Sequence, residues 1–234
     1  AMMILSTFLE PYSNSAAHGM WLAAILLHGV LMVYYTLRFV RNARLQNVLA
    51  NYYIVYVGIA AAAVTAPVFE QPEIATAAFW IGFAAFLIVF IPVTVRYVRL
   101  PEVPNPVKPL ICIYAAPASL CLTAYIETVT PVSPEFLIGL YIVACLLYLF
   151  ALQKVISYRS LPFYPSYAAF TFPFVIAATA STQVTNYLET FTGHALPLME
   201  GVALTQTGIA AVLVVYVLLR YLQFFLKQVP AGNK

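Results

Sequence analysis

The chain contains very little charge. Only 8% of its 234 residues are charged, none of them is aspartate, and 63% are hydrophobic. The mean hydropathy of the whole chain is +0.90. A soluble domain carries about a quarter of its residues as charged side chains. The shortage of charge therefore excludes an ordinary soluble domain and indicates an integral membrane protein.

Reactive side chains are scarce as well. The three cysteines lie within apolar runs and have no histidine or acidic residue at metal-ligand spacing, which favours a packing role for them. The histidines are scattered, and His28 lies in the middle of an apolar segment, where a proton relay and a hydrogen bond to a neighbouring helix are both open. We therefore expect no catalytic residues, no metal, no cofactor and no nucleic-acid partner, and we expect that the protein is not an enzyme.

Seven apolar segments are long enough to cross a bilayer, which takes about 20 residues for each helix. Short links separate them, and several of these links contain proline, which ends helices and builds turns. We therefore predict an all-α membrane protein with a single transmembrane domain over residues 1–234. The predicted spans are residues 17–40, 48–69, 74–98, 109–128, 134–157, 164–188 and 197–226.

The few charges are divided between the two sides of this arrangement. All eleven lysines and arginines, up to Lys234, fall on one side, whereas seven of the eight glutamates fall on the other and only Glu102 does not. The positive-inside rule then predicts that the basic side and the C-terminus are cytoplasmic. We expect the plasma membrane, or in a bacterium the inner membrane.

Residues 1–9 are apolar but too short to span, and Glu10 after them belongs to the outer side. We expect these residues to be the outer part of a further helix, so the sequence suggests that an N-terminal portion is missing from the chain.

The last six spans pair into three hairpins, and the two members of each hairpin differ in composition. The first member carries small or hydroxyl residues at helical spacing, whereas the second is rich in large aliphatic and aromatic residues. Small residues either allow close helix packing or line a pathway. In the second reading the first members form an inner ring around a central pore, and the second members form an outer shell. The candidate pore-lining residues are Gly58, Ala62, Thr65, Ala116, Ser119, Thr123, Ala169, Ile176 and Thr179.

Two of these inner spans contain a central proline, Pro117 and Pro173. Broken helices at membrane depth are tolerated where they border protein or a cavity. Pro173 removes the backbone donor that would bond to the carbonyl of Ala169, so we expect a bend there. Phe172, beside it, is expected to protrude from a face that otherwise carries mostly small residues.

Two short stretches carry a family resemblance. "AFTFPF" (residues 169–174) and "APASLCLTAY" (residues 116–125) resemble segments of the tellurite-resistance/dicarboxylate transporter family, which includes TehA-type bacterial proteins and plant guard-cell slow anion channels. The resemblance implies ten helices in five hairpins around a pore inside each subunit, and a homotrimer. It also implies that Phe172 is the gate, and that residues 1–9 are the tail of the third helix.

The expected function is that of an anion channel, or a channel-like anion transporter, with a phenylalanine gate in a proline-bent helix. Two alternatives stay open: a carrier for dicarboxylate, sulfite or tellurite-type oxyanions, and a membrane receptor or structural subunit without flux. The expected partners are small inorganic or organic anions and membrane lipid. Hydroxyl groups along the inner spans and the basic cytoplasmic rim are expected to attract the anion.

Overall fold

The computed structural model describes residues 1–41 and 44–228, and every regular element in these residues is a helix. Lys234, one of the basic residues assigned to the cytoplasmic side, lies outside the described residues. Seven helical segments are long and apolar enough to cross a membrane. The expectation of an all-α membrane protein is confirmed.

Four of the seven segments are built on unbroken α-helices. α2 continues at its C-terminal end into a short π-helical turn, η1 (Thr36–Val40). The four helices are α2 (Asn14–Tyr35), α5 (Pro72–Arg99), α7 (Pro134–Tyr158) and α9 (Pro197–Gln228). Two short elements lie outside the seven segments: α1 (Met2–Leu9) precedes α2, and the 3₁₀ turn η2 (Leu45–Asn47) precedes the second segment.

The other three segments change helix type along their length. The second segment alternates between α-helix and 3₁₀-helix, and the fourth and sixth begin as 3₁₀-helix and continue as α-helix. Their elements are α3 (Tyr52–Tyr56), η3 (Val57–Ile59), α4 (Ala60–Thr65) and η4 (Ala66–Phe69); η5 (Asn105–Ala115) and α6 (Ala116–Thr128); η6 (Pro165–Phe170) and α8 (Phe172–Thr192). The 3₁₀ run of η5 is unusually long, because such runs rarely exceed three or four residues.

Proline explains two of these changes. Pro117 and Pro173 both lie in the first turn of an α-helix, α6 and α8, where a missing backbone N–H is tolerated. The ring prevents the preceding residues from continuing the same helix. The sequence predicted a bend at Pro173. The structure instead ends one helix at Phe170 and begins the next at Phe172, with Thr171 at φ −103° and ψ −87° between them.

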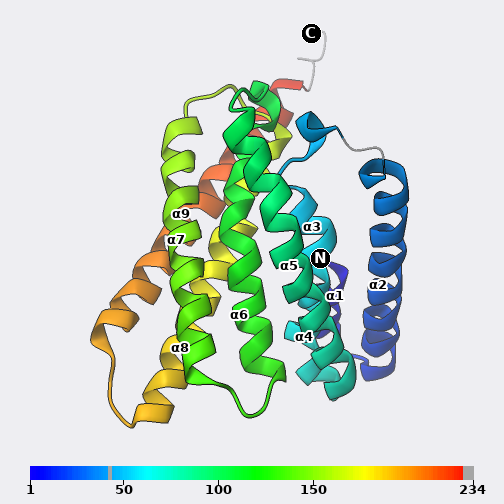
Figure 1. Ribbon diagram of the computed structural model, residues 1–234, viewed down its shortest axis with the longest axis vertical. Helices are drawn as coiled ribbons and strands as arrows, with labels where there is room; N and C mark the ends of the chain where they lie inside the picture. The colour runs from blue at the N-terminus through cyan, green and yellow to red at the C-terminus, as the bar shows by residue number, and fades with distance from the viewer. Residues whose placement is uncertain (42–43, 229–234) are drawn as a thin grey trace, which may run out of the picture.

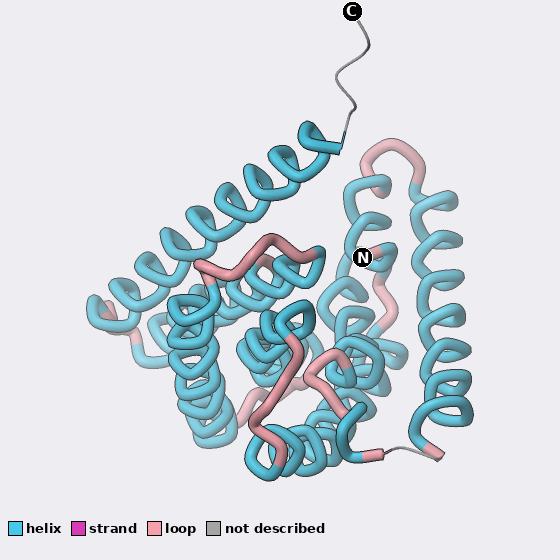
Figure 2. Tube along the Cα trace, turned by 90° about the horizontal axis from the view of Figure 1, so that it is seen from above, coloured by secondary structure: helices cyan, strands magenta, loops and turns pink. Residues whose placement is uncertain are grey.

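The helices form an inner row and an outer layer (Figures 1 and 2). α6 packs against α4 and α8 and also contacts α5 and α7. In the most apolar stretch of the segment that contains α6, 89% of the residues are buried, against 11% in the segment that contains α2. α2 and α9 lie at opposite edges of the molecule in Figure 1.

Each inner segment packs on the outer helix that follows it in the chain, so α4 contacts α5, α6 contacts α7, and α8 contacts α9. The approach of α4 to α5 depends on Gly82. A Cβ atom at this position would lie 2.8 Å from the Cβ of Ala60, which is closer than real side chains come. The helices of each hairpin expected from the sequence therefore pack on each other, and α4 and α5 approach closely.

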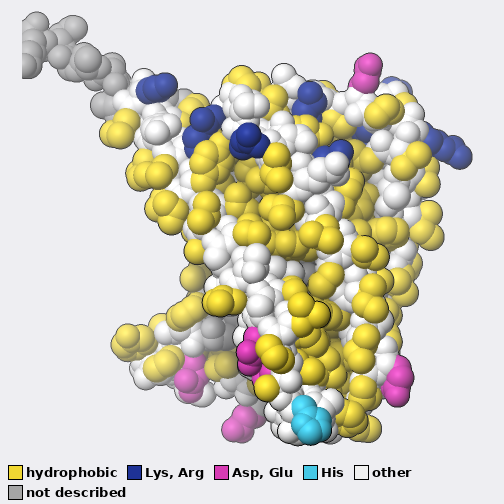
Figure 3. Space-filling model, turned by 90° about the vertical axis from the view of Figure 1, so that its left-hand side faces the viewer, with side chains coloured by type: hydrophobic (Ala, Val, Ile, Leu, Met, Phe, Trp, Pro, Cys, Tyr) yellow, Lys and Arg dark blue, Asp and Glu magenta, His cyan; other side chains and the backbone are white. Residues whose placement is uncertain are grey.

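Basic and acidic side chains lie at opposite ends of the molecule. Figure 3 shows lysine and arginine along the upper end and glutamate along the lower end, with one acidic side chain among the basic ones. A wide apolar surface separates the two ends, as expected of a protein that crosses a bilayer.

Candidate functional site

The break before α8 is held by local hydrogen bonds. The backbone N–H and the hydroxyl of Thr171 both donate to the carbonyl of Ala168, at 3.1 and 2.7 Å. The carbonyl of Thr171 in turn accepts from the N–H groups of Phe174 and Val175, at 3.0 and 3.1 Å. Polar backbone groups at membrane depth must find partners inside the protein. Thr171 supplies these partners, so the break is a defined feature of the structure.

The three phenylalanines around this break have different surroundings. Phe170 and Phe174 have no exposed surface, whereas 42% of Phe172 is exposed. The Phe170 ring packs on Tyr167 and the Phe174 ring on Tyr148, with ring centroids 4.9 and 5.3 Å apart. The break therefore separates one open ring from two packed ones.

Phe172 belongs to an exposed face of α8. Val175, Thr179 and Thr182 follow it at helical spacing and are all exposed. Thr179 donates to the carbonyl of Val175 at 3.1 Å, so its single O–H donor is already engaged. Farther along, this face meets α9 in a groove of about 590 Å³ that includes Thr179, Thr182 and Thr207. This face is the most open of those that carry candidate residues.

The candidates in the second segment lie toward α2. A Cβ atom at Gly58 would be 3.0 Å from Cε1 of His28, a residue of α2. Thr65 accepts a hydrogen bond from Nε1 of Trp21 at 2.8 Å and donates to the carbonyl of Ala61 at 2.8 Å. His28 donates to the carbonyl of Val55 at 2.9 Å, which is the neighbouring-helix bond that the sequence left open.

The candidates on α6 are buried among helices. Ser119 donates to the carbonyl of Ala115 at 2.8 Å and borders a small internal space between α6, α7, α8 and α9. Thr123 has no exposed surface, and its hydroxyl has no hydrogen-bond partner among the residues that the structure describes. A buried hydroxyl without a partner is costly and suggests a ligand or water. The remaining candidates, Ala62, Ala116, Ala169 and Ile176, are buried.

Several polar contacts between helices were missed in the sequence. Ser181 of α8 donates to Oε1 of Gln206 of α9 at 2.7 Å, and both side chains are buried. Gln183 donates to Oε1 of Glu127 at 2.8 Å, which ties α8 to α6 near the acidic end. The signal for the first contact was available, because an amide inside an apolar span needs a partner from another helix.

No group of three or more histidine, cysteine and acidic side chains that could hold a metal ion occurs within residues 1–41 and 44–228. The polar groups of the inner segments are hydroxyls and amides, and the charged side chains lie toward the two ends. Broken, partly polar inner segments inside an apolar outer layer are typical of helical membrane transport proteins.

The chain belongs to the SLAC1 family, described as voltage-dependent anion channel, because the model of this family matches residues 1–222. The match confirms the resemblance carried by "AFTFPF" and "APASLCLTAY". It supports anion transport in general for this chain, and the family consists of channels and transporters rather than enzymes. No curated protein and no solved structure matches the chain.

Proposed function

We propose that the protein conducts anions along the exposed face of α8, and that the ring of Phe172 closes this path. The observation that carries the proposal is the contrast at the break, where Phe172 is 42% exposed while Phe170 and Phe174 are fully buried. A bulky ring left open on a membrane-buried inner segment needs a role other than packing against neighbours.

The break fixes the position of the ring. Pro173 starts α8, and the bonds of Thr171 hold the turn before it, so the backbone under Phe172 has little freedom. The ring then changes its position mainly by side-chain rotation, which is fast and requires no helix movement. Such a ring suits a gate that opens locally.

Anion preference in this proposal comes from hydroxyl groups and from the basic rim. Thr179 lies on the open face and Thr123 has an unpartnered buried hydroxyl. Thr65, Ser119 and Thr179 are proposed to add weaker polar contacts than Thr123, since all three hydroxyls already donate to a backbone carbonyl. Gly58, Ala62, Ala116, Ala169 and Ile176 are proposed to leave room along the inner segments. Weak multiple contacts allow rapid passage, whereas a fixed charge would hold the anion.

The gate is tested by comparing alanine variants of the complete protein in planar bilayers. We expect Phe172→Ala to raise the anion conductance at least about tenfold, which corresponds to a barrier lowered by about 1.4 kcal/mol. The stability of this variant should change little, because its ring makes few contacts. Phe170→Ala and Phe174→Ala are the controls and should lower stability without opening the path. Equal behaviour of all three variants would rule out the gate.

The same recordings distinguish the two alternatives. A carrier for dicarboxylate, sulfite or tellurite-type oxyanions would show saturable flux without single-channel currents. A receptor or structural subunit would show no flux in liposomes. Either result would replace the channel proposal.

Residues 1–234 are proposed to form one transmembrane domain of a homotrimer, with a pathway inside each subunit. The outer helices α2, α5, α7 and α9 would supply the contacts between subunits, since they carry most of the exposed large apolar side chains. The charge separation supports a cytoplasmic basic end in a plasma or bacterial inner membrane. A cysteine at Asn105 that reacts only from the outside would reverse this orientation.

A further inference from the structure

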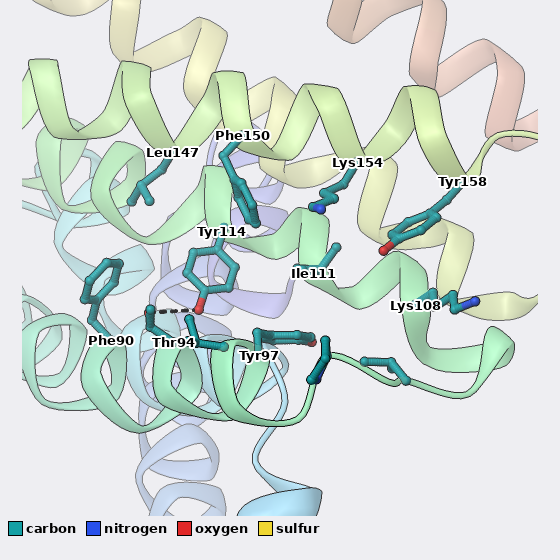
Figure 4. A pocket seen from close by; sticks show the side chains of 13 residues that line it. Phe90, Thr94, Tyr97, Lys108, Ile111, Tyr114, Leu147, Phe150, Lys154 and Tyr158 are labelled. Atoms are coloured by element: carbon teal, nitrogen blue, oxygen red, sulfur yellow. Dashed lines mark hydrogen bonds between the residues drawn. The ribbon is translucent and has the colours of Figure 1, made fainter.

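A cavity of about 370 Å³ lies at the basic end of the molecule, away from the face of α8 that carries Phe172. Its walls come from α5, η5, α7 and the link between α5 and η5, and none of its lining residues belongs to α8 or α9 (Figure 4). It therefore does not include the face of α8 that carries Phe172.

One end of this cavity is polar and positively charged. Lys108 of η5 and Lys154 of α7 both line it, together with the tyrosines Tyr97 and Tyr158. In Figure 4 the nitrogen of Lys154 points toward Phe150 and Tyr114, whereas the nitrogen of Lys108 lies at the outer rim of the cavity and points away from Lys154. The Lys154 ammonium lies 5.3 Å from the centre of the Phe150 ring. This cation–π contact holds the ammonium group beside the ring.

The other end of the cavity is apolar. Phe90 of α5 and Leu147 of α7 face each other across it, with Phe150 and Tyr114 beside them (Figure 4). The hydroxyl of Tyr114 is paired with the hydroxyl of Thr94 at 2.9 Å, so neither hydroxyl needs a ligand. The two ends together match a ligand with an anionic part and an apolar part.

The two lysine charges have no acidic partner in the cavity wall. None of its lining residues, all of which lie in the described part of the chain, is a glutamate. Glu102 stands between two lining residues, Pro101 and Val103, but it is exposed and does not line the cavity. All other glutamates belong to the opposite side of the membrane arrangement. The two lysines are therefore available to an anion.

We propose that this cavity binds an anionic phospholipid of the leaflet on the basic side. The phosphate contacts Lys108 and Lys154, and part of one acyl chain lies against Phe90 and Leu147. A single lysine at a helix end commonly extends to the interface without a specific partner. Here lysines from two different elements line one cavity with an apolar floor, and the outward Lys108 lies where a lipid headgroup would enter, which fits a lipid better than a soluble anion.

The ligand is tested by native mass spectrometry of the complete protein in detergent, titrated with phosphatidylglycerol or phosphatidylcholine. We expect a clear preference for phosphatidylglycerol at one site in each subunit. The double variant Lys108→Gln/Lys154→Gln should weaken phosphatidylglycerol binding about 10- to 30-fold, as expected for two lysines near a lipid surface. Phosphatidylcholine binding should stay as it is.

A matched control separates this site from the overall charge. Arg41 and Lys227 are exposed basic residues outside the cavity, so Arg41→Gln/Lys227→Gln removes the same charge. This control should retain the preference for phosphatidylglycerol, and an equal loss in both double variants would overturn the proposal. Displacement of the lipid by inorganic phosphate or glycerol phosphate at similar concentrations would also overturn it, because it would identify a soluble-anion site. Lipid binding is measured without recording anion conductance, so its result does not depend on whether Phe172 is a gate.

Discussion

α8 and α9 are the two arms of the last hairpin and lie against each other, yet they are built differently. The span that contains α8 is interrupted at Thr171 and begins as a 3₁₀-helix, whereas α9 runs unbroken from Pro197 to Gln228. In their most apolar stretches, 61% of the residues are buried in the first and 28% in the second.

The difference shows how surroundings determine what a membrane helix can contain. A helix that faces lipid must satisfy its own backbone, so α9 is continuous and its outer face is made of valine and leucine. A helix that faces other helices can contain a break and several hydroxyls, because neighbours supply the missing partners. The two arms therefore respond differently to the same substitution.

The largest difference is expected for phenylalanine truncation. Phe174 of α8 is fully buried against Tyr148, whereas 58% of Phe225 of α9 is exposed. Phe174→Ala should destabilise the protein by up to about 3–5 kcal/mol, because the ring leaves an unfilled space. Phe225→Ala should cost less than about 0.5 kcal/mol. Thermal unfolding in detergent measures both, and equal losses would show that α9 is also packed on its outer side.

A smaller difference is expected for glycine substitution in the outer helices. Gly82→Ala in α5 places a Cβ atom 2.8 Å from Ala60 Cβ. This overlap should lower the free energy of unfolding by about 1–3 kcal/mol, and the higher helix propensity of alanine should recover up to about 1 kcal/mol of it. Gly139 of α7 has no atom within 4 Å of such a Cβ, so Gly139→Ala should be neutral or stabilising. A stabilised Gly82→Ala variant would contradict the close contact between α4 and α5.

The smallest difference is expected for the polar contact between the two arms. Gln206→Leu removes the acceptor of the buried Ser181 hydroxyl, and interhelical bonds of this kind contribute about 0.6–1.7 kcal/mol in membranes. Thr205→Val is the control on the same helix, because its hydroxyl is exposed and bonds only to the carbonyl of Gly201. Thermal unfolding should detect a loss in the first variant and almost none in the second.

The coarse features of this protein were predictable because composition determines them. Long apolar runs predicted the membrane-spanning segments. The positions of lysine, arginine and glutamate predicted which ends of these segments lie on the same side of the membrane. Pro117 and Pro173 marked where the helix type changes, but the length of the 3₁₀ run was not predictable, since the apolar residues 110–115 suit an α-helix equally well. The bond from Trp21 to Thr65 and the cavity that Lys108 and Lys154 both line depend on contacts between distant segments, which periodicity within one helix does not reveal.

The separation of charge to the two ends also has an electrical consequence. Moving one elementary charge through the full membrane potential involves about 2.3 kcal/mol for each 100 mV. In the sequence the lysines, arginines and glutamates fall near the ends of the spans, so a shift of any helix carries little charge through the field. Rotation of the neutral ring of Phe172 carries none. We therefore expect that voltage acts on this protein mainly through the permeating anions.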